Sequence, residues 1–329
     1  MFKRITIINL FILLNCFAAD SLFTNPVAVD GADPWVIKHQ ETYFYCYSKD
    51  NAIWINKSDD LVKVVQMNGV KVWEPETGKD YSKEIWAPEL HFIQDKWYIY
   101  FAADDGNNEN HRMFVLESLT EDTQGGYLFK GKISDASDKW AIDGTVLHYN
   151  SNLYFIWSGW EGDVNVQQNL YIAEMENPWT IKGKRVKISE PEYEWEMVGN
   201  PLINEGPQVL RKDEKVYIIY SASGSWTDNY CLGRLTLTSE DPLDNKAWNK
   251  HHSPVFSGTT SVISPGHASF TKSPDESEDW IIYHTAKHKG AAWDRNIRMQ
   301  KFSWTQDGIP CFGYPVENNI PMAVPSKNK

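Results

Sequence analysis

Short apolar segments recur along the chain at a nearly constant spacing. Each is rich in β-branched and aromatic residues and follows a short polar turn, as the second strand of a β-hairpin does. The five segments are TYFYCYS from Thr42, WYIYFAA from Trp97, LYFIWSG from Leu153, VYIIYSA from Val216 and DWIIYHT from Asp279. Their period of roughly 55 to 63 residues indicates a repeat architecture.

Another strand-like segment lies just before each of these turns. These segments are ADPWVIK, WAPELHFI, IDGTVLHY, EGPQVLR and GHASFTK, and further strand candidates follow later in most repeats. No long segment with the helical period of 3.6 residues occurs between Asp30 and Val316. The pattern predicts an all-β fold, a five-bladed β-propeller, because radial closure protects the sheet edges. A β-sandwich is the alternative, but it does not explain the matched hairpins.

The N-terminal segment differs from the repeats. A basic start, an apolar run from Ile5 to Leu14 and small residues after it are typical of a signal peptide, which we expect to comprise residues 1–19. The run is too short for a comfortable membrane span. Cys16 is a poor match to a lipoprotein signal, so we expect a secreted or periplasmic protein without a lipid anchor. Residues 20–329 are predicted to form a single domain.

Composition narrows the choice of partner. The net charge of −12 would repel phosphate backbones, so an uncharged ligand is favoured over nucleic acid. Aromatic residues make up 14% of the chain, and flat rings pack well against the C–H faces of sugars, although most rings are expected in the core. Three cysteines remain after removal of the predicted signal peptide: Cys46, Cys231 and Cys311. Their odd number and wide spacing argue against a disulfide framework and against a zinc site. No feature of the sequence requires an oligomer, so we expect a monomer.

Titratable residues recur where the first strand of each repeat begins. The aligned positions are Asp33, Ala87, Asp143, Glu205 and His267. In a propeller the first strand of each blade lines the central channel, so these side chains are expected to converge. Singly, each has an ordinary interpretation as a turn residue or a core imidazole. Acids gathered together repel one another, however, and two carboxylates with a third acid suit glycoside hydrolysis.

Several longer motifs make the interpretation specific. The chain resembles glycoside hydrolase family 43 in GADPWVI, SKEIWAPELHF, WAIDGTVL, INEGPQVL, SPGHASF and WTQDGIPCFGYPV, which span the chain after the predicted signal peptide. The block WSGWEGDVNVQQNLYIAEMENPW is similar to the branch that contains exo-acting α-L-arabinofuranosidases. This resemblance implies a five-bladed propeller and an inverting mechanism.

The resemblance also implies a role for each motif residue. Asp33 corresponds to the general base, Glu205 to the general acid, and Asp143 to the residue that adjusts the acid's pKa and orients it. His267 corresponds to a channel residue that holds a water or a structural Ca²⁺, which would take oxygen ligands; no cofactor is otherwise expected. Relatives often have an acid where this chain has Gln208. An inverting enzyme would place the carboxyl groups of Asp33 and Glu205 about 6.5–9.5 Å apart.

Substrate-binding residues are less clearly marked. Arg298 in NIRMQKF is the candidate for a substrate contact, with Arg295 as its competitor. Trp35, Trp86 and Trp160 are candidates for sugar platforms near the mouth of the channel, and core packing is the rival interpretation of each.

The predicted function is release of terminal L-arabinofuranose from arabinan, arabinoxylan or their oligosaccharides. A β-xylosidase is the alternative within the class, because both sugars present a similar five-carbon outline and loops decide between them. A non-catalytic carbohydrate-binding propeller is the alternative from another class, although a lectin needs neither a base nor a proton donor. A sialidase-like propeller lacks support, since its recurrent Ser-x-Asp-x-Gly-x-Thr-Trp turn is absent.

Overall fold

The computed structural model describes residues 22–327, and nearly all of its regular structure is β-strand. Within this part of the chain the one α-helix is α1 (Leu61–Gln66), and three short 3-10 turns lie in connections. The predicted signal peptide lies outside the described residues. None of the described helices is long and apolar enough to span a membrane.

Twenty of the described strands form five antiparallel groups of four, which we call blades 1 to 5, and blades 3 and 4 are joined into one eight-stranded sheet. Blade 1 consists of β2 (Trp35–His39), β3 (Thr42–Lys49), β4 (Ala52–Ser58) and β5 (Val70–Trp73). Blade 2 consists of β6 (Lys83–Ile93), β7 (Lys96–Asp104), β8 (Arg112–Ser118) and β9 (Tyr127–Lys132). Blade 3 consists of β10 (Ala141–Tyr149), β11 (Asn152–Gly159), β12 (Gln167–Asn177) and β13 (Thr180–Ser189). Blade 4 consists of β14 (Leu202–Lys212), β15 (Lys215–Ala222), β16 (Cys231–Leu237) and β17 (Trp248–Lys250). Blade 5 consists of β18 (Ile263–Lys272), β19 (Asp279–Ala286), β20 (Arg295–Trp304) and β21 (Pro310–Cys311).

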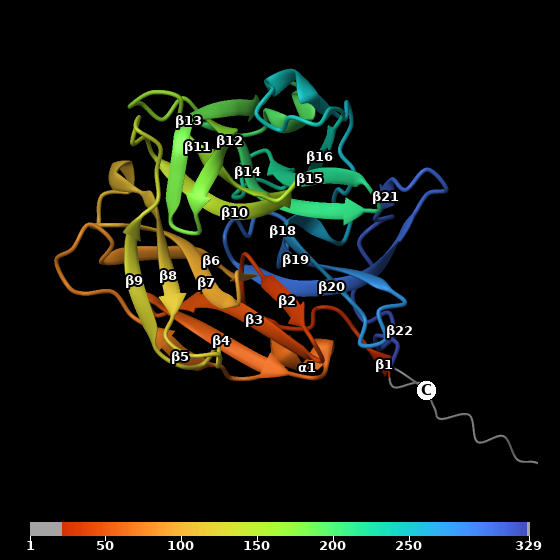
Figure 1. Cartoon of the computed structure of the whole chain (residues 1–329). Coiled ribbons are helices and arrows are strands. Elements are labelled where there is room, and N and C mark those ends of the chain that lie inside the picture. The colour runs from red at the N-terminus through yellow and green to blue at the C-terminus, as the bar shows by residue number, and fades with distance from the viewer. Residues whose placement is uncertain (1–21, 328–329) are drawn as a thin grey trace, which may run out of the picture.

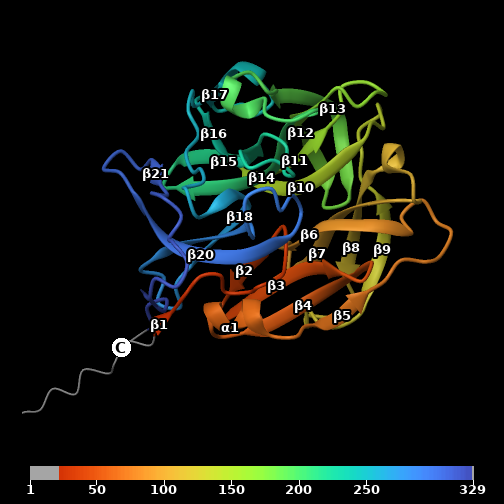
Figure 2. The same cartoon turned by 180° about the vertical axis from the view of Figure 1, so that it is seen from behind.

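The blades are arranged in a ring. Their innermost strands contact one another in the order β2, β6, β10, β14 and β18, and β18 returns to β2. These five strands lie toward the middle of the molecule in both views (Figures 1 and 2). A short parallel pairing between β12 and β14 additionally joins blades 3 and 4. The predicted five-bladed propeller is thereby confirmed, and the β-sandwich is not formed.

The two ends of the described chain meet beside blade 5. Strand β1 (Leu22–Phe23) pairs with β22 (Met322–Ala323), and the two lie side by side in Figure 1. Ala28 also forms an antiparallel bridge with Ile297 of β20. The segment before blade 1 is therefore bonded to the last blade, which ties the beginning of the ring to its end.

The core consists of one cluster of buried hydrophobic side chains between each pair of neighbouring blades. Successive residues of a strand point to opposite faces, so adjacent residues enter different clusters. In blade 4, Ile218 packs toward blade 3 and Ile219 toward blade 5. In blade 5, Ile281 packs toward blade 4 and Ile282 toward blade 1. Burial of each such side chain contributes about 1.5–3 kcal/mol, which explains the continuous apolar runs of the repeats.

Each innermost segment has a residue in the left-handed backbone region at one equivalent position, and β6 and β18 have a further one each, at Glu84 and Ser264. The residues at the equivalent position, with their φ angles, are Asp33 (47°), Ala87 (40°), Asp143 (55°), Gly206 (53°) and His267 (45°). In blades 2 to 5 the pairing between the first and second strands shifts register at this point, which marks a β-bulge.

The bulges correct the sequence alignment in blade 4. Gly206, and not Glu205, is the structural counterpart of Asp143 and His267. Glu205 lies one residue earlier, at the position that Trp86 occupies in blade 2. Residue types alone do not reveal this offset of one residue. It arises from the left-handed backbone conformation, which glycine adopts without steric penalty.

Candidate active site

Four of the residues singled out from the sequence meet at the centre of the ring. Asp33 lies just before β2, Asp143 in β10, Glu205 in β14 and His267 in β18. His267 Nδ1 is 3.3 Å from Asp33 Oδ1 and 3.9 Å from Asp143 Oδ2. Asp143 Oδ2 also accepts a hydrogen bond of 3.0 Å from the backbone N–H of Gly206, the residue after Glu205. Blades 1, 3, 4 and 5 thus contribute to one cluster.

Asp33 is surrounded by nitrogen atoms. Its Oδ1 is 3.1 Å from His284 Nδ1 and 3.3 Å from both His267 Nδ1 and Arg295 Nη1. Burial by itself would raise the pKa of Asp33, but His267, His284 and Arg295 together hold this pKa well below the usual range. The side chain is still 25% exposed, so a water molecule can reach it. Asp33 is therefore a carboxylate at working pH and can accept a proton.

Glu205 has the opposite electrostatic setting. Its side chain is buried, and its Oε1 accepts a hydrogen bond of 2.8 Å from the Tyr230 hydroxyl. Burial raises the pKa of Glu205, and the negative charge of Asp33 adds to this, against the opposing effects of Tyr230 and His267. A carboxyl group with a raised pKa keeps its proton longer as the pH rises, which suits a proton donor.

Asp143 interacts electrostatically with both Asp33 and Glu205. Burial, with the charges of Glu205 and Asp33, raises its pKa to about 7, although His267 opposes the shift. The charge of Asp143 in turn disfavours ionisation of a nearby carboxyl group. Asp143 and Glu205 therefore titrate as a coupled pair.

His284 belongs to the site but was not singled out from the sequence. Its Nδ1 is 3.1 Å from both the backbone nitrogen and Oδ1 of Asp33, and its ring stacks on Tyr230 with 5.5 Å between centroids. Burial, followed by the charge of Arg295, lowers the pKa of His284 to about 3, so the imidazole is neutral. Its signal was a polar residue inside an apolar repeat: the sixth residue of DWIIYHT is His284, where VYIIYSA has Ser221.

The structure separates the two arginine candidates. Arg295 reaches Asp33, whereas Arg298 is 2% exposed and donates to Asn318 Oδ1 at 2.7 Å and to the Val316 carbonyl at 2.6 Å. The expectation for Arg298 is therefore corrected in favour of its competitor. The two positions are three residues apart in β20, so their side chains point to opposite faces of the strand.

The three tryptophan candidates also differ. Trp160 is 3% exposed and stacks on Trp140 at 4.9 Å, so core packing accounts for it. Trp35 is partly buried between blades 1 and 2, where its Nε1 donates to the Leu90 carbonyl. Trp86 is partly exposed and occupies the position in blade 2 that Glu205 occupies in blade 4. One face of its ring stacks on His111 with 4.0 Å between centroids, and Trp86 remains the candidate sugar platform.

The Ca²⁺ that the resemblance implies near His267 would need oxygen ligands from the surrounding residues. Deeper along the channel strands, Gln208 Nε2 donates to Glu89 Oε1, and Glu89 Oε2 is 2.9 Å from His91 Nε2. Ca²⁺ takes six to eight oxygen ligands, but nitrogen donors already engage both oxygens of this carboxylate. In the part of the chain that the structure describes, no group of three or more His, Cys, Asp or Glu residues is arranged to hold a metal ion. These residues do not fit a Ca²⁺ site.

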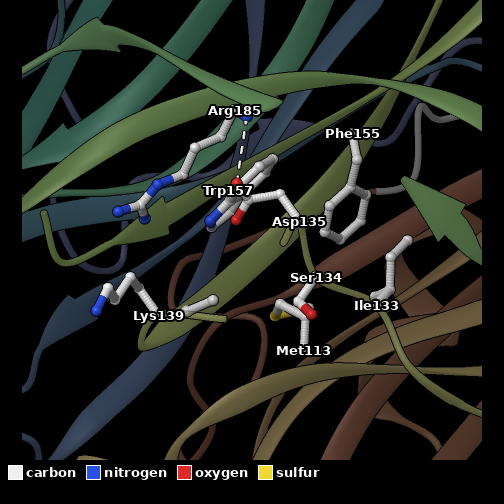
Figure 3. A pocket seen from close by; sticks show the side chains of 9 residues that line it. Met113, Ile133, Ser134, Asp135, Lys139, Phe155, Trp157 and Arg185 are labelled. Carbon is white, nitrogen blue, oxygen red and sulfur yellow. Dashed lines mark hydrogen bonds between the residues drawn. The ribbon is translucent and has the colours of Figure 1, made fainter. Parts of the chain in front are cut away.

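A small pocket lies elsewhere, between blades 2 and 3. Met113, Phe155 and Trp157 form part of its wall, and the backbone N–H of Arg185 donates to Asp135 Oδ2 at its edge (Figure 3). None of the three carboxylates described above lines this pocket. It is a packing defect between two blades and not part of the candidate site.

The chain is similar to known proteins over most of its length. The family model described as glycosyl hydrolases family 43 matches residues 23–310. An extracellular exo-α-(1→5)-L-arabinofuranosidase from Streptomyces avermitilis is 37% identical over 91% of this chain and 64% of its own length. α-L-Arabinofuranosidase 43 from Humicola insolens is 32% identical over 89% of this chain and 64% of its own length. The chain thus spans less than two thirds of these two relatives.

Solved structures agree with this relationship. The crystal structure of an α-L-arabinofuranosidase from Lactobacillus brevis is 34% identical and superimposes with a TM-score of 0.83, covering 91% of this chain and 98% of that one. A thermostable family-43 glycoside hydrolase, at 24% identity and a TM-score of 0.75, supports the fold, with coverage of 93% and 100%. The motifs, the propeller, the central carboxylates and these matches lead to one conclusion: the chain belongs to glycosyl hydrolase family 43.

Proposed function

We propose that this protein is an inverting glycoside hydrolase that releases terminal L-arabinofuranose from arabinan- or arabinoxylan-type chains. One observation carries the proposal: two carboxyl groups of one site lie in opposite environments, Asp33 among three side-chain nitrogen atoms and Glu205 buried beside the Tyr230 hydroxyl. The pKa of Asp33 is lowered and that of Glu205 is raised. Such a pair supplies a base and an acid at the same pH.

The proposed reaction follows from these protonation states. Glu205 donates its proton to the glycosidic oxygen while the bond from that oxygen to the anomeric carbon breaks. A water molecule attacks the anomeric carbon from the opposite face and transfers a proton to Asp33. The products are a sugar of inverted anomeric configuration and a shortened chain. Loss of the proton from Asp33 to solvent and reprotonation of Glu205 restore the enzyme.

The neighbouring residues position these two groups. Asp143 holds the backbone at Gly206, directly after the proposed acid. Asp143 and Glu205 disfavour each other's ionisation, so the pair retains a proton as the pH rises. Tyr230 holds one oxygen of Glu205, so the other oxygen is free to face the substrate. The nitrogen atoms of Arg295 and His267 keep Asp33 ionised and orient it toward the water.

Arabinofuranose is the favoured sugar because of the relatives. Those from Streptomyces avermitilis, Humicola insolens and Lactobacillus brevis, at 32–37% identity, are all named arabinofuranosidases. Their names carry over only as part of this proposal. A β-xylosidase would use the same carboxylates and is an outcome of the test below.

The place of action and the assembly are further parts of the proposal. Two relatives from Streptomyces are named extracellular, and the predicted signal peptide agrees with export. The net charge of −12 suits a neutral carbohydrate better than an anionic polymer. We propose that residues 20–329 act as one catalytic domain and as a monomer.

The direct test is hydrolysis of aryl α-L-arabinofuranoside and aryl β-D-xylopyranoside by the wild type and by Glu205→Gln. Cleavage of the arabinoside, strongly reduced in the variant, supports the sugar and the acid together. Preference for the xyloside would move the substrate to the alternative. Glu214→Gln, in an exposed turn of blade 4, is the matched control and should behave as the wild type. Sugar binding without cleavage of any glycoside would overturn the proposal in favour of a carbohydrate-binding propeller.

A further inference from the structure

A large aromatic side chain is held in solvent beside the candidate site. Trp293 is 66% exposed, although tryptophan is rarely left so open. It lies in the segment 287–294, which connects β19 to β20. Its Nε1 donates a hydrogen bond of 3.2 Å to Ser225 Oγ, so the orientation of the indole is set while its ring stays uncovered.

A second tryptophan, Trp226, lies next to Trp293 in a neighbouring connection between strands. Trp226 lies in the segment 223–230 between β15 and β16, and its ring centroid is 6.1 Å from that of Trp293 at an interplanar angle of 63°. Trp226 is half-buried and packs closely against the backbone at Gly199 and Gly224. A Cβ atom at Gly224 would come within 2.7 Å of the indole. The two rings thus form a fixed corner and not a pair of mobile surface groups.

The segments that carry this corner also hold the proposed catalytic groups. Segment 223–230 ends at Tyr230, whose hydroxyl donates to Glu205 at 2.8 Å. The segment with Trp293 leads directly into Arg295, which contacts both Asp33, at 3.3 Å, and the Ser225 carbonyl, at 3.4 Å.

The two segments are also bonded to each other. The backbone N–H of Gly290 donates to Asp228 Oδ1 at 2.7 Å, which adds a second link to the one between Trp293 and Ser225. The corner is therefore tied at several points to the residues that hold the base and the acid.

We propose that Trp293 and Trp226 bind the sugar residue on the leaving-group side of the scissile bond. This inference rests on the proposed function. The terminal sugar must lie among the buried carboxylates, so the rest of the chain has to leave toward solvent, where this corner stands. An uncharged sugar ring presents C–H groups that pack on an indole face. Because binding covers this exposed aromatic surface, it is favourable.

The test compares two arabinosides that differ in the proposed contact. α-1,5-Linked arabinotriose has a sugar on the leaving-group side, whereas methyl α-L-arabinofuranoside has only a methyl group there. We expect Trp293→Ala to lower kcat/KM for arabinotriose by roughly five- to tenfold, mainly through KM, as loss of one stacking contact would. The loss for the methyl glycoside should be much smaller. Trp293→Phe keeps a ring and should recover most of the arabinotriose activity.

Tyr314→Ala serves as the control, because Tyr314 is 80% exposed and lies after β21 in the C-terminal segment. It should leave both rates as in the wild type. Equal loss for the two substrates in Trp293→Ala would show that the indole only supports Arg295, and it would overturn the subsite. No loss for either substrate would overturn it as well. A wild-type protein that cleaves neither arabinoside would instead overturn the proposed function, and the subsite with it.

Discussion

The backbone N–H of Gly206 donates to Asp143 Oδ2 across 3.0 Å, so an acid of blade 3 holds the residue that follows the proposed proton donor of blade 4. The left-handed φ of 53° at Gly206 makes this contact possible. A Cβ atom at this position would lie 3.2 Å from His267 Nδ1. One glycine therefore connects the positions of Glu205, Asp143 and His267.

We expect Gly206→Ala to disturb both stability and activity. An alanine in the left-handed region costs about 1–2 kcal/mol, and its methyl group would press on His267. Thermal unfolding should show a lower Tm, and kcat should fall with it. Ala87→Gly is the matched control, since Ala87 has the equivalent conformation in blade 2, with a φ of 40°. That change should not lower Tm. A Gly206→Ala protein with unchanged Tm and kcat would contradict this account of the bulge.

We expect kcat/KM to fall mainly on the alkaline side of its pH profile. The pKa of Asp33 lies well below the usual range, so the base stays ionised and activity should persist in moderately acidic buffer. Burial raises the pKa of Glu205, so the donor keeps its proton above the usual range of a glutamic acid, and activity should fall at higher pH as this proton is lost. Initial rates across pH 4 to 9 measure this profile.

Replacing Asp143 tests the coupling between the two acids. Asp143→Asn keeps an oxygen that can accept from Gly206 but removes the negative charge, which should lower the pKa of Glu205. The alkaline limb of kcat/KM should therefore move to lower pH. An alkaline limb that stays in place, or moves upward, would show that Asp143 does not raise the pKa of the donor.

His284 is expected to act on the base through its contact with Asp33. His284→Phe keeps a ring that can stack on Tyr230 but removes the nitrogen 3.1 Å from Asp33. The backbone N–H of Asp33, which donates to this nitrogen, would lose its acceptor at a cost of about 1–3 kcal/mol, so kcat/KM should fall roughly 5- to 100-fold. The pKa of Asp33 should rise, and the acidic limb should move to higher pH. The same substitution at the exposed His288 should do neither. A lower rate with an unmoved acidic limb would indicate only a packing role.

Leaving-group dependence should identify Glu205 as the acid. Glu205→Gln cannot donate a proton, so hydrolysis of arabinotriose, whose leaving alcohol is a poor one, should fall by about 10²–10⁴-fold. An aryl arabinoside with an acidic phenol needs less protonation, and its cleavage should fall much less. Equal losses on the two substrates would assign Glu205 a role other than proton donation.

Much of the architecture could be predicted because it depends on periodic burial. The five repeats alternate apolar residues into neighbouring clusters, as Ile281 and Ile282 show, so their number and spacing indicated five blades. The sequence also predicted that Asp33, Asp143 and His267 lie together, and His267 Nδ1 is 3.3 Å from Asp33 and 3.9 Å from Asp143, because the first strand of every blade is innermost. These features follow from strand order alone.

Features that depend on strand faces and loop paths could not be predicted. The bulge at Gly206 shifts the register by one residue, which a comparison of residue types does not show. Arg295 and Arg298 lie on opposite faces of one strand, and only the fold tells which face meets Asp33. Trp226 and Trp293 lie in irregular connections that contain no repeat, so their meeting at the rim depends on tertiary structure.

The stereochemistry of the first product tests the central claim most directly, because it reports whether water or Asp33 itself attacks the anomeric carbon. Proton NMR can follow the anomeric signals during the first minutes of arabinotriose hydrolysis, before mutarotation mixes them. With Asp33 as a base that activates water, the initial product from this α-linked substrate should be the β-anomer of arabinofuranose. Initial formation of the α-anomer would mean retention through a covalent intermediate, and it would contradict the roles proposed for Asp33 and Glu205.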